Sequence, residues 1–195
     1  MKILIACEYS ATIRNAFQAL GHNAWSCDLL PSDGGGQHIQ GDVMGVLNQG
    51  WDMMIAHPPC TYLANSGVHW LHKDASRWDL LDEGCAFFKR LLNCNIPRIA
   101  IENPIPHKYA VERIGRKYDQ LIQPYHFGHL ESKATCFWLK GLPKLKHTTN
   151  LRKETMALPY NQRNRLHMLP PTPDRWKLRS KTFEGIADAV ATQWG

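Results

Sequence analysis

The chain has 195 residues, 44% of them hydrophobic, and a formal net charge of +6. That length supports one compact core and is short for two domains, so the sequence predicts a single globular domain. No apolar run approaches the roughly 18 residues of a membrane span, and MKILIAC at the N-terminus is too short for a signal peptide. These features argue against membrane contact and predict a cytoplasmic protein.

Six cysteines are spread irregularly along the chain and fall mostly within apolar runs. They are Cys7, Cys27, Cys60, Cys85, Cys94 and Cys136. Irregular spacing of this kind favours free thiols over a disulfide framework. Any cysteine chemistry is therefore expected at a single residue.

Residues 140–181, which we call the basic segment, hold most of the positive charge. The segment carries eleven lysines and arginines against two acidic residues, whereas residues 1–139 carry twelve basic and thirteen acidic residues. A near-neutral body with a basic, proline-containing segment suits a polyanionic partner, either nucleic acid or a nucleotide. The alternative is that these charges only keep a solvated loop soluble.

The chain opens on a predicted strand and helix. KILIACE (2–8) is an apolar run without a helical period, which predicts a strand. Ser10 is placed to cap a helix whose apolar residues recur at helical spacing up to Leu20, and Gly21 suits its end. The pattern therefore predicts a strand, a tight turn and a helix.

Further strands and a long helix follow. HNAWSCDLL (22–30) predicts a second strand that ends at Asp28, and WDMMIAH (51–57) predicts another. Over residues 74–95 apolar side chains recur every three or four positions, which indicates an amphipathic helix. IPRIAIE (96–102) predicts a further short buried strand.

Strands that alternate with helices predict an α/β fold, with a mostly parallel sheet covered by helices on both faces. Such sheets bind ligands beyond the carboxyl ends of their strands. Polar and reactive residues collect at the predicted ends: Glu8, Asp28, His57 to Cys60, and Glu102 to Pro104. We therefore expect the functional site at this edge of the sheet.

The pattern changes after residue 120. Residues 121–143 predict two extended segments around the turn-like FGHLES. Residues 147–180 are polar and rich in proline and arginine, which predicts a loop. KTFEGIADAVATQW (181–194) has helical spacing and predicts a closing helix that packs on the sheet. One domain over residues 1–195 accounts for the whole pattern.

Cys60 is the first candidate for chemistry. A thiolate is an effective nucleophile, and the corner formed by Pro58 and Pro59 would stiffen the loop that presents it. One alternative is a small buried side chain beside a structural turn. Another is a zinc site with the spacing H-x2-C…H-x2-H, formed by His57, Cys60, His69 and His72.

Glu102 favours the chemical interpretation, because it ends the strand expected beside Cys60. A protonated carboxyl there could hydrogen-bond N3 of a cytosine ring, which draws electrons from C6 and prepares it for thiolate attack. Asp28 could accept hydrogen bonds from ribose hydroxyls, and Asp42 from an adenine amino group. Capping of a turn is the alternative for each aspartate.

These residues together resemble motifs of the C5-cytosine methyltransferase family, particularly its short phage and prophage members. Pro58-Pro59-Cys60, followed by Ser66-Gly67, resembles the catalytic loop of that family. Glu102-Asn103-Pro104 resembles its Glu-Asn-Val motif.

The resemblance continues through both halves of the chain. Asp28 and Gly41-Asp42-Val43 fall where the family contacts S-adenosylmethionine. FGHLESKAT (127–135) is similar to the segment Tyr-Gly-x-Pro-Gln-x-Arg-x-Arg, and TFEGIADAVATQW (182–194) resembles the last motif, whose helix returns to the cofactor pocket.

Membership would imply a Rossmann-like methyltransferase fold, S-adenosylmethionine as cofactor, and methyl transfer to C5 of a cytosine in DNA or in a free nucleotide. The implied catalytic residues are Cys60, Glu102, Asn103 and Lys133. The implied cofactor-binding residues are Glu8, Tyr9, Ser10, Asp28, Leu29, Asp42 and Pro58. The implied substrate-binding residues are Pro59, Ser66, Glu131 and Thr135. No metal is implied.

The chain departs from the family pattern in three places. Residues 7–11 lack the glycines of the first motif, Phe-x-Gly-x-Gly. Lys133 and Thr135 replace the arginines of Gln-x-Arg-x-Arg, and NQRNR (161–165) is a second candidate for them. Only the basic segment stands where DNA-acting members carry a large target-recognition region. Relaxed specificity, a smaller substrate, a homodimer or a separate specificity partner would each fit this short segment.

Two other classes of function remain open. An amino-methyltransferase would use a Pro-Pro-aromatic corner at the same strand end, and Cys60 in the aromatic position argues against it. A catalytically silent module that binds nucleotide or DNA is compatible with the altered first motif.

Overall fold

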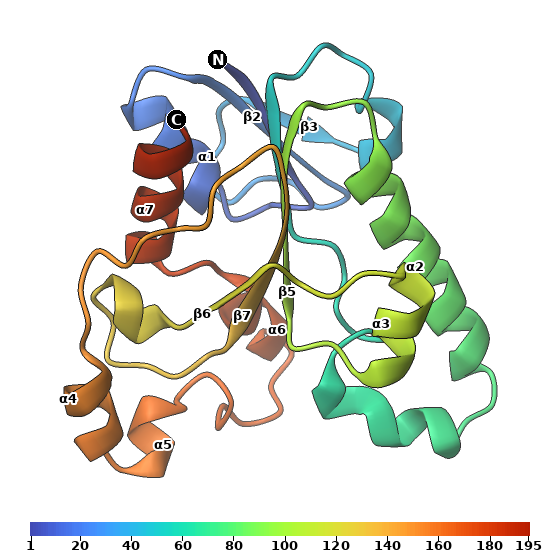
Figure 1. Ribbon diagram of the computed structural model, residues 1–195, viewed down its shortest axis with the longest axis vertical. Helices are drawn as coiled ribbons and strands as arrows, with labels where there is room; N and C mark the ends of the chain where they lie inside the picture. The colour runs from blue at the N-terminus through green and yellow to red at the C-terminus, as the bar shows by residue number, and fades with distance from the viewer.

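Seven strands form one sheet in the computed structural model, which describes residues 1–195 (Figure 1). The strands are β1 (Lys2–Ala6), β2 (Asn23–Asp28), β3 (His38–Gln40), β4 (Met53–Ala56), β5 (Arg98–Pro104), β6 (Gln120–Ile122) and β7 (Thr135–Lys140). Their spatial order is β3-β2-β1-β4-β5-β7-β6, and only β7 runs against its neighbours.

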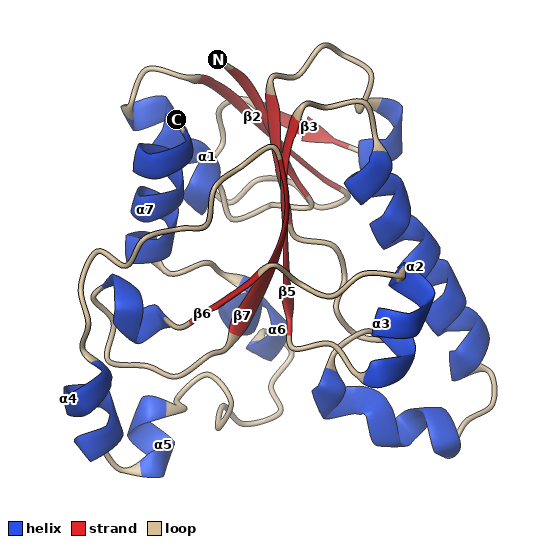
Figure 2. Ribbon diagram, in the orientation of Figure 1, coloured by secondary structure: helices blue, strands red, loops and turns tan.

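Helices cover both faces of this sheet (Figure 2). On one face, α1 (Thr12–Ala19) packs beside α7 (Glu184–Trp194); on the other, α2 (Arg77–Asn93) packs beside α3 (Lys108–Ile114). The predicted Rossmann-like α/β fold, with a mostly parallel sheet between two helical layers, is confirmed.

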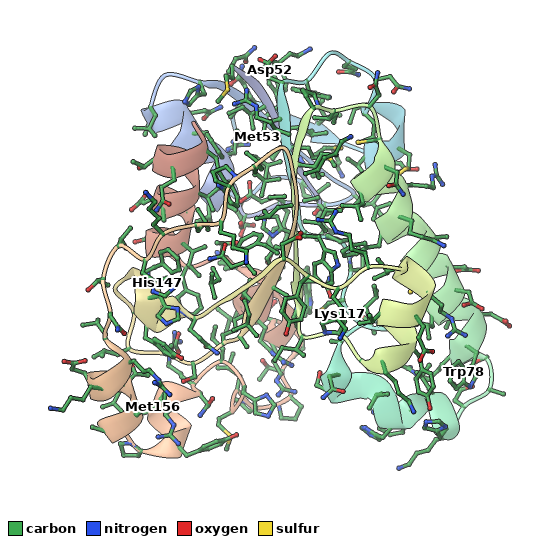
Figure 3. All side chains as sticks on the ribbon, in the orientation of Figure 1. Asp52, Met53, Trp78, Lys117, His147 and Met156 are labelled. Carbon is green, nitrogen blue, oxygen red and sulfur yellow. The ribbon has the colours of Figure 1, made fainter.

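Alternation along β1 shows how the sequence divides the core between the two layers. Ile3 and Ile5 belong to the buried cluster around α1 and α7, whereas Leu4 and Ala6 belong to the cluster around α2. Successive strand side chains point to opposite faces, so a strand buried on both faces is apolar throughout. In β4, Met53 is buried in the cluster around α1 and α7, whereas Asp52, just before the strand, is exposed at the surface (Figure 3).

The predicted start of α1 is displaced, because Ser10 is not its N-cap. Ala11 takes the cap position with φ of 63°, and Glu8 accepts hydrogen bonds from Ile13 N at 2.7 Å and Arg14 N at 3.3 Å. A carboxylate is a strong acceptor for the free N–H groups of a first turn. The capping residue therefore lies on the strand side of the turn, where a local pattern does not reveal it.

The predicted loop over residues 147–180 is wrong in part. Three short helices interrupt it: α4 (Arg152–Ala157), α5 (Tyr160–Arg163) and α6 (Arg175–Ser180). Single-turn 3-10 helices elsewhere are η1 (Val43–Gly45) and η3 (Pro124–Phe127), and η2 (Asn65–His72) is longer. None of the helices is long and apolar enough to cross a lipid bilayer.

Candidate active site

Two predicted strand ends meet at the carboxyl edge of the sheet. β4 and β5 are parallel neighbours with Ala56 opposite Ile101, so His57, directly after β4, lies beside Glu102, which is still paired with β7. His57 Nδ1 lies 3.0 Å from Glu102 Oε2, and both side chains are largely buried. The adjacency of these strand ends agrees with the sequence prediction. The His57–Glu102 contact itself depends on the register of the two strands, which the sequence did not reveal.

Glu102 is held as a carboxylate rather than as the protonated carboxyl that the sequence suggested. Burial raises the pKa of this carboxyl. The hydrogen bond from His57, the charge of His57 and the charge of Lys133 together lower the pKa by more than burial raises it, so the net shift is downward. The side chain is therefore an acceptor at neutral pH, with Oε2 facing His57.

Cys60 is the one exposed cysteine of the six, all of which are free thiols as predicted. Its carbonyl accepts hydrogen bonds from Leu63 N and Ala64 N, which close the turn after the Pro-Pro corner. Desolvation by nearby protein atoms raises the pKa of the thiol, and the charge of Glu102 adds to this. Lys133 and Arg179 act in the opposite direction. Without a ligand, the thiol form therefore dominates at neutral pH.

Asn103 ties β5 to the Pro-Pro corner. Its buried Nδ2 donates to the Pro58 carbonyl at 3.2 Å. Proline has no backbone N–H, so two consecutive prolines leave the corner short of donors, and this side chain supplies one from the neighbouring strand. The loop that carries Cys60 is thereby fixed to the strand that carries Glu102.

The FGHLES segment and the basic segment meet through an ion pair. Arg165 Nε lies 2.9 Å from Glu131 Oε1, and Arg165 Nη2 donates to Glu131 Oε2. Ser132 N donates to the Arg163 carbonyl at 2.6 Å. The second arginine candidate of the sequence, NQRNR, thus lies against the segment that lacks the family arginines. Glu131 is buried, so its pairing with a cation is required for charge balance.

Residues 131–135 form one wall of the site, and Lys133 and Thr135 lie on it nearest to the start of β7. Lys133 Nζ donates to the Arg179 carbonyl at 2.8 Å, and Thr135 lies opposite Pro104 in the β5–β7 ladder. Thr135 is buried, and its hydroxyl donates to the Lys133 carbonyl. Lys133 lines a narrow cavity together with Glu102, and its charge lowers the pKa of both Glu102 and Cys60.

A cavity of about 380 Å³ opens between these walls. The start of η2, the end of β5, the loop before β7 and the basic segment all contribute to it. Its lining residues are Ala64, Asn65, Ser66, Pro104, Ile105, Ser132, Lys133, Ala134, Tyr160, Asn164, Leu166, His167 and Arg179. Of the expected substrate residues, Ser66 lines this cavity; Pro59 is exposed on the corner beside it.

A second, narrower cavity lies behind His57 and Glu102. It reaches the α1 and α7 layer through Ile13, Phe183 and Ile186, and Lys133 also lines it. His57 Nε2 is buried and has no hydrogen-bond partner in the protein. The sequence predicted His57 among the polar residues at the strand ends and suggested a role for it only as a metal ligand; its place directly after β4 was the available signal for its contact with Glu102.

The expected cofactor residues gather at the ends of β1, β2 and β3. Asp28 Oδ1 accepts from Leu30 N and Asp42 Oδ1 accepts from Met44 N, so each caps a turn through one oxygen. Both carboxylates act on Cys7, whose pKa is raised to about 12, mainly by burial and then by Asp28. Two partly solvated carboxylates that lie close together are a donor set suited to hydroxyl and amino groups.

The first loop is similar to a glycine-containing motif only in its backbone shape. Cys7 and Ala11 have φ of 57° and 63°, the left-handed conformation that glycine adopts most easily. Glu8 is buried and its oxygens face the first turn of α1, whereas Leu29 is exposed at the end of β2. The loop therefore keeps a glycine-like backbone without glycine.

Helix α6 covers this loop. Tyr9 Oη lies 3.1 Å from the Lys177 carbonyl and 3.0 Å from Ser180 Oγ, and the Tyr9 and Trp176 rings are 5.7 Å apart. Ser10 bonds only within the loop, to Glu8 and Thr12. The basic segment thus touches both the first loop and the Cys60 side of the sheet edge.

The zinc alternative is not supported. No group of three or more histidine, cysteine, aspartate or glutamate side chains is arranged to hold a metal ion. His69 packs on Trp70, and His72 packs against Trp78 and Tyr109, so these histidines belong to aromatic clusters.

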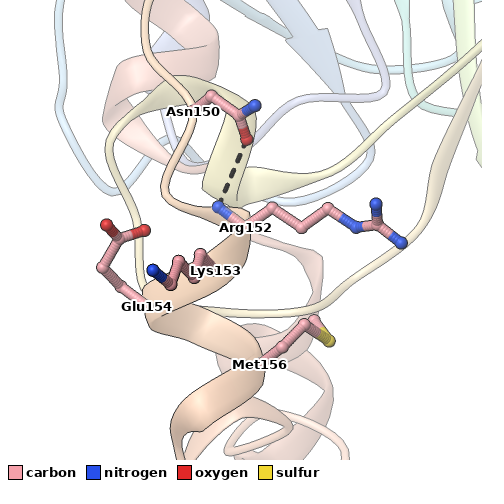
Figure 4. Close-up of a pocket in the computed structure, with 5 residues that line it drawn as sticks. All are labelled: Asn150, Arg152, Lys153, Glu154 and Met156. Atoms are coloured by element: carbon pink, nitrogen blue, oxygen red, sulfur yellow. Dashed lines mark hydrogen bonds between the residues drawn. The ribbon is translucent and has the colours of Figure 1, made fainter.

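A shallow hollow at the start of α4 lies apart from these strand ends (Figure 4). Asn150, Arg152, Lys153, Glu154 and Met156 line it, and Arg152 N donates to Asn150 Oδ1 at 3.2 Å. Its side chains come from one exposed turn of helix, without a buried polar group. It is a feature of the surface of the basic segment.

No protein-family model and no curated protein matches the chain. Similar solved structures include a protein described as a DNA modification methyltransferase encoded within a prophage (E. coli), at 14% identity and a TM-score of 0.46, covering 81% of this chain and 55% of that one. Another is the Entamoeba histolytica methyltransferase EhMeth, at 13% identity and a TM-score of 0.47, covering 76% of this chain and 57% of that one. This chain spans little more than half the length of either protein, and both likenesses are distant.

Proposed function

We propose that the protein transfers a methyl group from S-adenosylmethionine to C5 of a cytosine in DNA, through a covalent bond between Cys60 and C6. One observation carries this proposal: Asn103 ties the loop of Cys60, the one exposed cysteine, to the strand β5 that carries Glu102, and the same loop continues into Ala64–Ser66, which line a cavity of about 380 Å³. A nucleophile and a ring-binding carboxylate are the two groups that this chemistry requires.

The ends of β1, β2 and β3 would hold the cofactor, which supplies the methyl group as an electrophile. Asp28 and Asp42 each have an oxygen free of protein partners, suited to ribose hydroxyls and the adenine amino group. The other expected cofactor residues would lie around the same strand ends: Tyr9, Ser10, Leu29 and Pro58. Glu8 would act by fixing the loop and the first turn of α1.

Glu102 would bind the cytosine edge as a carboxylate. His57 occupies Oε2, which leaves Oε1 to accept from the exocyclic amino group or from a protonated N3. A proton held at N3 draws electrons from C6, so attack by sulfur becomes easier and C5 becomes a carbon nucleophile. His57 would therefore be a positioning residue for Glu102.

Substrate binding would also favour the Cys60 thiolate. The charge of Glu102 raises the pKa of Cys60, while Lys133 and Arg179 lower it. When a protonated ring edge neutralises the charge of Glu102, that charge no longer raises the pKa of Cys60, whereas Lys133 and Arg179 still lower it. The proton lost by sulfur passes to solvent. After methylation the C5 proton passes to a water molecule, the C5–C6 double bond re-forms, and the carbon–sulfur bond breaks to return the Cys60 thiolate.

The remaining expected residues would shape the substrate pocket. Pro59 and Ser66 lie along the loop that presents Cys60, and Asn103 braces that loop. Glu131 would hold Arg165 in place, and Thr135 would fix Lys133.

A free cytosine nucleotide is the second candidate substrate. A cavity of about 380 Å³ falls at the lower end of the roughly 300–1,000 Å³ range of small-molecule sites. A silent nucleotide-binding or DNA-binding module is the third candidate, and it is favoured only by the loop that lacks glycine and lies under α6.

Incubation with methyl-labelled S-adenosylmethionine tests the proposal. DNA and dCMP are offered separately to the wild type, Cys60→Ala and Cys94→Ala, the last removing a half-buried cysteine outside the site. We expect label in one substrate with the wild type and Cys94→Ala, and none with Cys60→Ala. Label in neither substrate would contradict methyl transfer, and equal transfer by Cys60→Ala would contradict the covalent route.

A further inference from the structure

The basic segment forms one wall of the larger cavity. Five residues of this segment line a space of about 380 Å³ opposite the loop that follows Cys60 and the end of β5: Tyr160, Asn164, Leu166, His167 and Arg179. The segment is thus a wall of the pocket. A single extruded or unpaired nucleotide fits a space of this size, whereas a base pair within a duplex does not.

The wall is fixed to the body at several points. Glu131 pairs with Arg165, Ser132 N donates to the Arg163 carbonyl, and Lys133 donates to the Arg179 carbonyl. Its helices α4, α5 and α6 have only six, four and six residues. Enzymes that extrude a base from a duplex need surface to hold both strands and a group to fill the gap. Short helices fixed to the body in this way offer little extended surface for two strands.

The charge of the cavity suits a sugar-phosphate chain. Lys133, His167 and Arg179 line it, and no acidic residue is among its lining residues. Ser132 Oγ is buried without a hydrogen-bond partner on the same wall and offers a further polar contact. The surrounding basic segment carries eleven lysines and arginines against two acidic residues, which extends the positive surface beyond the cavity.

An aromatic ring stands at the cavity wall. Tyr160 is 58% exposed at the start of α5, and the Arg163 guanidinium lies 5.7 Å from its ring centre. On the facing wall Ile105 is 40% exposed. Proteins that bind single strands combine a basic groove with exposed aromatic rings on which unpaired bases stack. In a duplex the bases are already stacked on each other and cannot use such a ring.

We infer that this protein binds single-stranded nucleic acid, with one cytosine in the cavity, a flanking base stacked on Tyr160, and the backbone held by Arg179 and Lys133. The identity of the base rests on the proposed function, whereas the preference for an unpaired strand rests on the cavity, its charge and Tyr160.

Fluorescence anisotropy tests this inference without any methyl transfer. The probes are a labelled cytosine-containing DNA strand and the same strand annealed to its complement, and dCMP serves as a competitor. Tyr160→Ala removes the ring, Tyr160→Phe keeps it, and Arg179→Ala removes a cavity cation. Arg152→Ala is the matched control, since it removes a cation of the same segment at the hollow of Figure 4. Circular dichroism verifies that each variant is folded.

We expect the single strand to bind at least about 10-fold more tightly than the duplex, because the duplex must first be opened. Tyr160→Ala should weaken binding of the single strand by about 5-fold to 100-fold, while Tyr160→Phe stays close to the wild type. Arg179→Ala should cost about 5-fold or more, and Arg152→Ala about 2-fold or less, since only the former cation faces the bound strand.

Three results would overturn the inference: duplex binding as tight as that of the single strand, an equal loss for Arg152→Ala and Arg179→Ala, or displacement of the strand by dCMP at equal concentration. Selective single-strand binding without methyl transfer would contradict the proposed function alone. Methyl transfer to duplex DNA without single-strand preference would contradict this inference alone.

Discussion

At the scale of single residues, the candidate site depends on which side chains leave adjacent strands together. The sequence predicted Cys60 and Glu102 as candidate site residues because each comes at the carboxyl end of an apolar run that predicts a strand. His57 could not be paired with Glu102 in advance, since the contact needs β4 and β5 to be neighbours in one particular register. The lowered pKa of Glu102 follows mainly from that contact, with a smaller contribution from the charge of Lys133.

Replacement of His57 tests its control of Glu102. His57→Leu should raise the pKa of Glu102, because the hydrogen bond and the charge that lower it are lost. His57→Asn retains a donor near the position of Nδ1 and should restore part of the shift. Carbon-13 NMR titration of the glutamate carboxyls measures this directly. An unchanged Glu102 pKa in His57→Leu would contradict the positioning role.

The same pKa shift predicts a pH dependence of stability. Glu102 has a lowered pKa in the folded protein, so its contribution to the free energy of unfolding is present above the ordinary value of 4.5 and is lost as pH falls through the lowered value. His57→Leu should therefore destabilise the protein by about 1 to 2 kcal/mol at pH 7 and by less in acid. Urea unfolding at several pH values measures the difference, and a pH-independent loss would argue against this cause.

Asn103 gives a second residue-level prediction. Asn103→Ala leaves the Pro58 carbonyl without its donor and should cost about 1 to 3 kcal/mol of stability. It should also slow modification of Cys60 by substrate, since the loop loses its brace. Asn95→Ala, at an exposed position after α2, is the control. Equal stability of the two variants would contradict the bracing role.

At the scale of elements, the sequence predicted the longer pieces and failed on the shorter ones. The strands β1, β2, β4, β5 and β7 lie in apolar runs, and the helices α1, α2 and α7 have apolar residues at helical spacing. By contrast, β3 has three residues, and α4 to α6 are single turns or little more. Elements this short are stabilised by tertiary contacts, so their own sequence carries little signal. The cap supplied by Glu8 was missed for the same reason.

Helix α6 is held over the first loop by Tyr9, which predicts an effect on its mobility. Tyr9→Phe removes the hydroxyl contacts with Lys177 and Ser180 and should increase hydrogen exchange in Arg175–Ser180. The loss of stability should be about 1 kcal/mol. Tyr109→Phe, in an aromatic cluster on the opposite face, is the control and should leave that exchange unchanged. Equal exchange in both variants would contradict the contact.

At the scale of the whole molecule, the basic segment differs in charge from the rest of the chain but folds together with it as part of one structure. The sequence showed the positive charge of the basic segment, and its polar, proline-rich composition predicted a loop. That it folds back on the body was not, because the Glu131–Arg165 pair joins residues far apart in the chain. The segment that looked too small to grip a duplex is a wall of the candidate site.

Loss of the Glu131 charge should free this wall. Glu131→Gln weakens the pairing with Arg165, so trypsin should cut within residues 160–181 faster than in the wild type. The sheet should remain intact, as judged by far-ultraviolet circular dichroism. Glu154→Gln, on exposed α4, is the matched control. Cleavage at the wild-type rate would show that the ion pair does not hold the segment.

The most direct measurement is mass spectrometry of the protein after incubation with S-adenosylmethionine and an oligonucleotide that carries 5-fluorocytosine. Fluorine at C5 cannot leave as a cation, so the bond between sulfur and C6 would persist after methyl transfer. The account predicts a stable adduct on the peptide that contains Cys60 and no adduct in Cys60→Ala. An adduct at another residue, or methyl transfer to ordinary cytosine with no adduct to the fluorinated base, would contradict it.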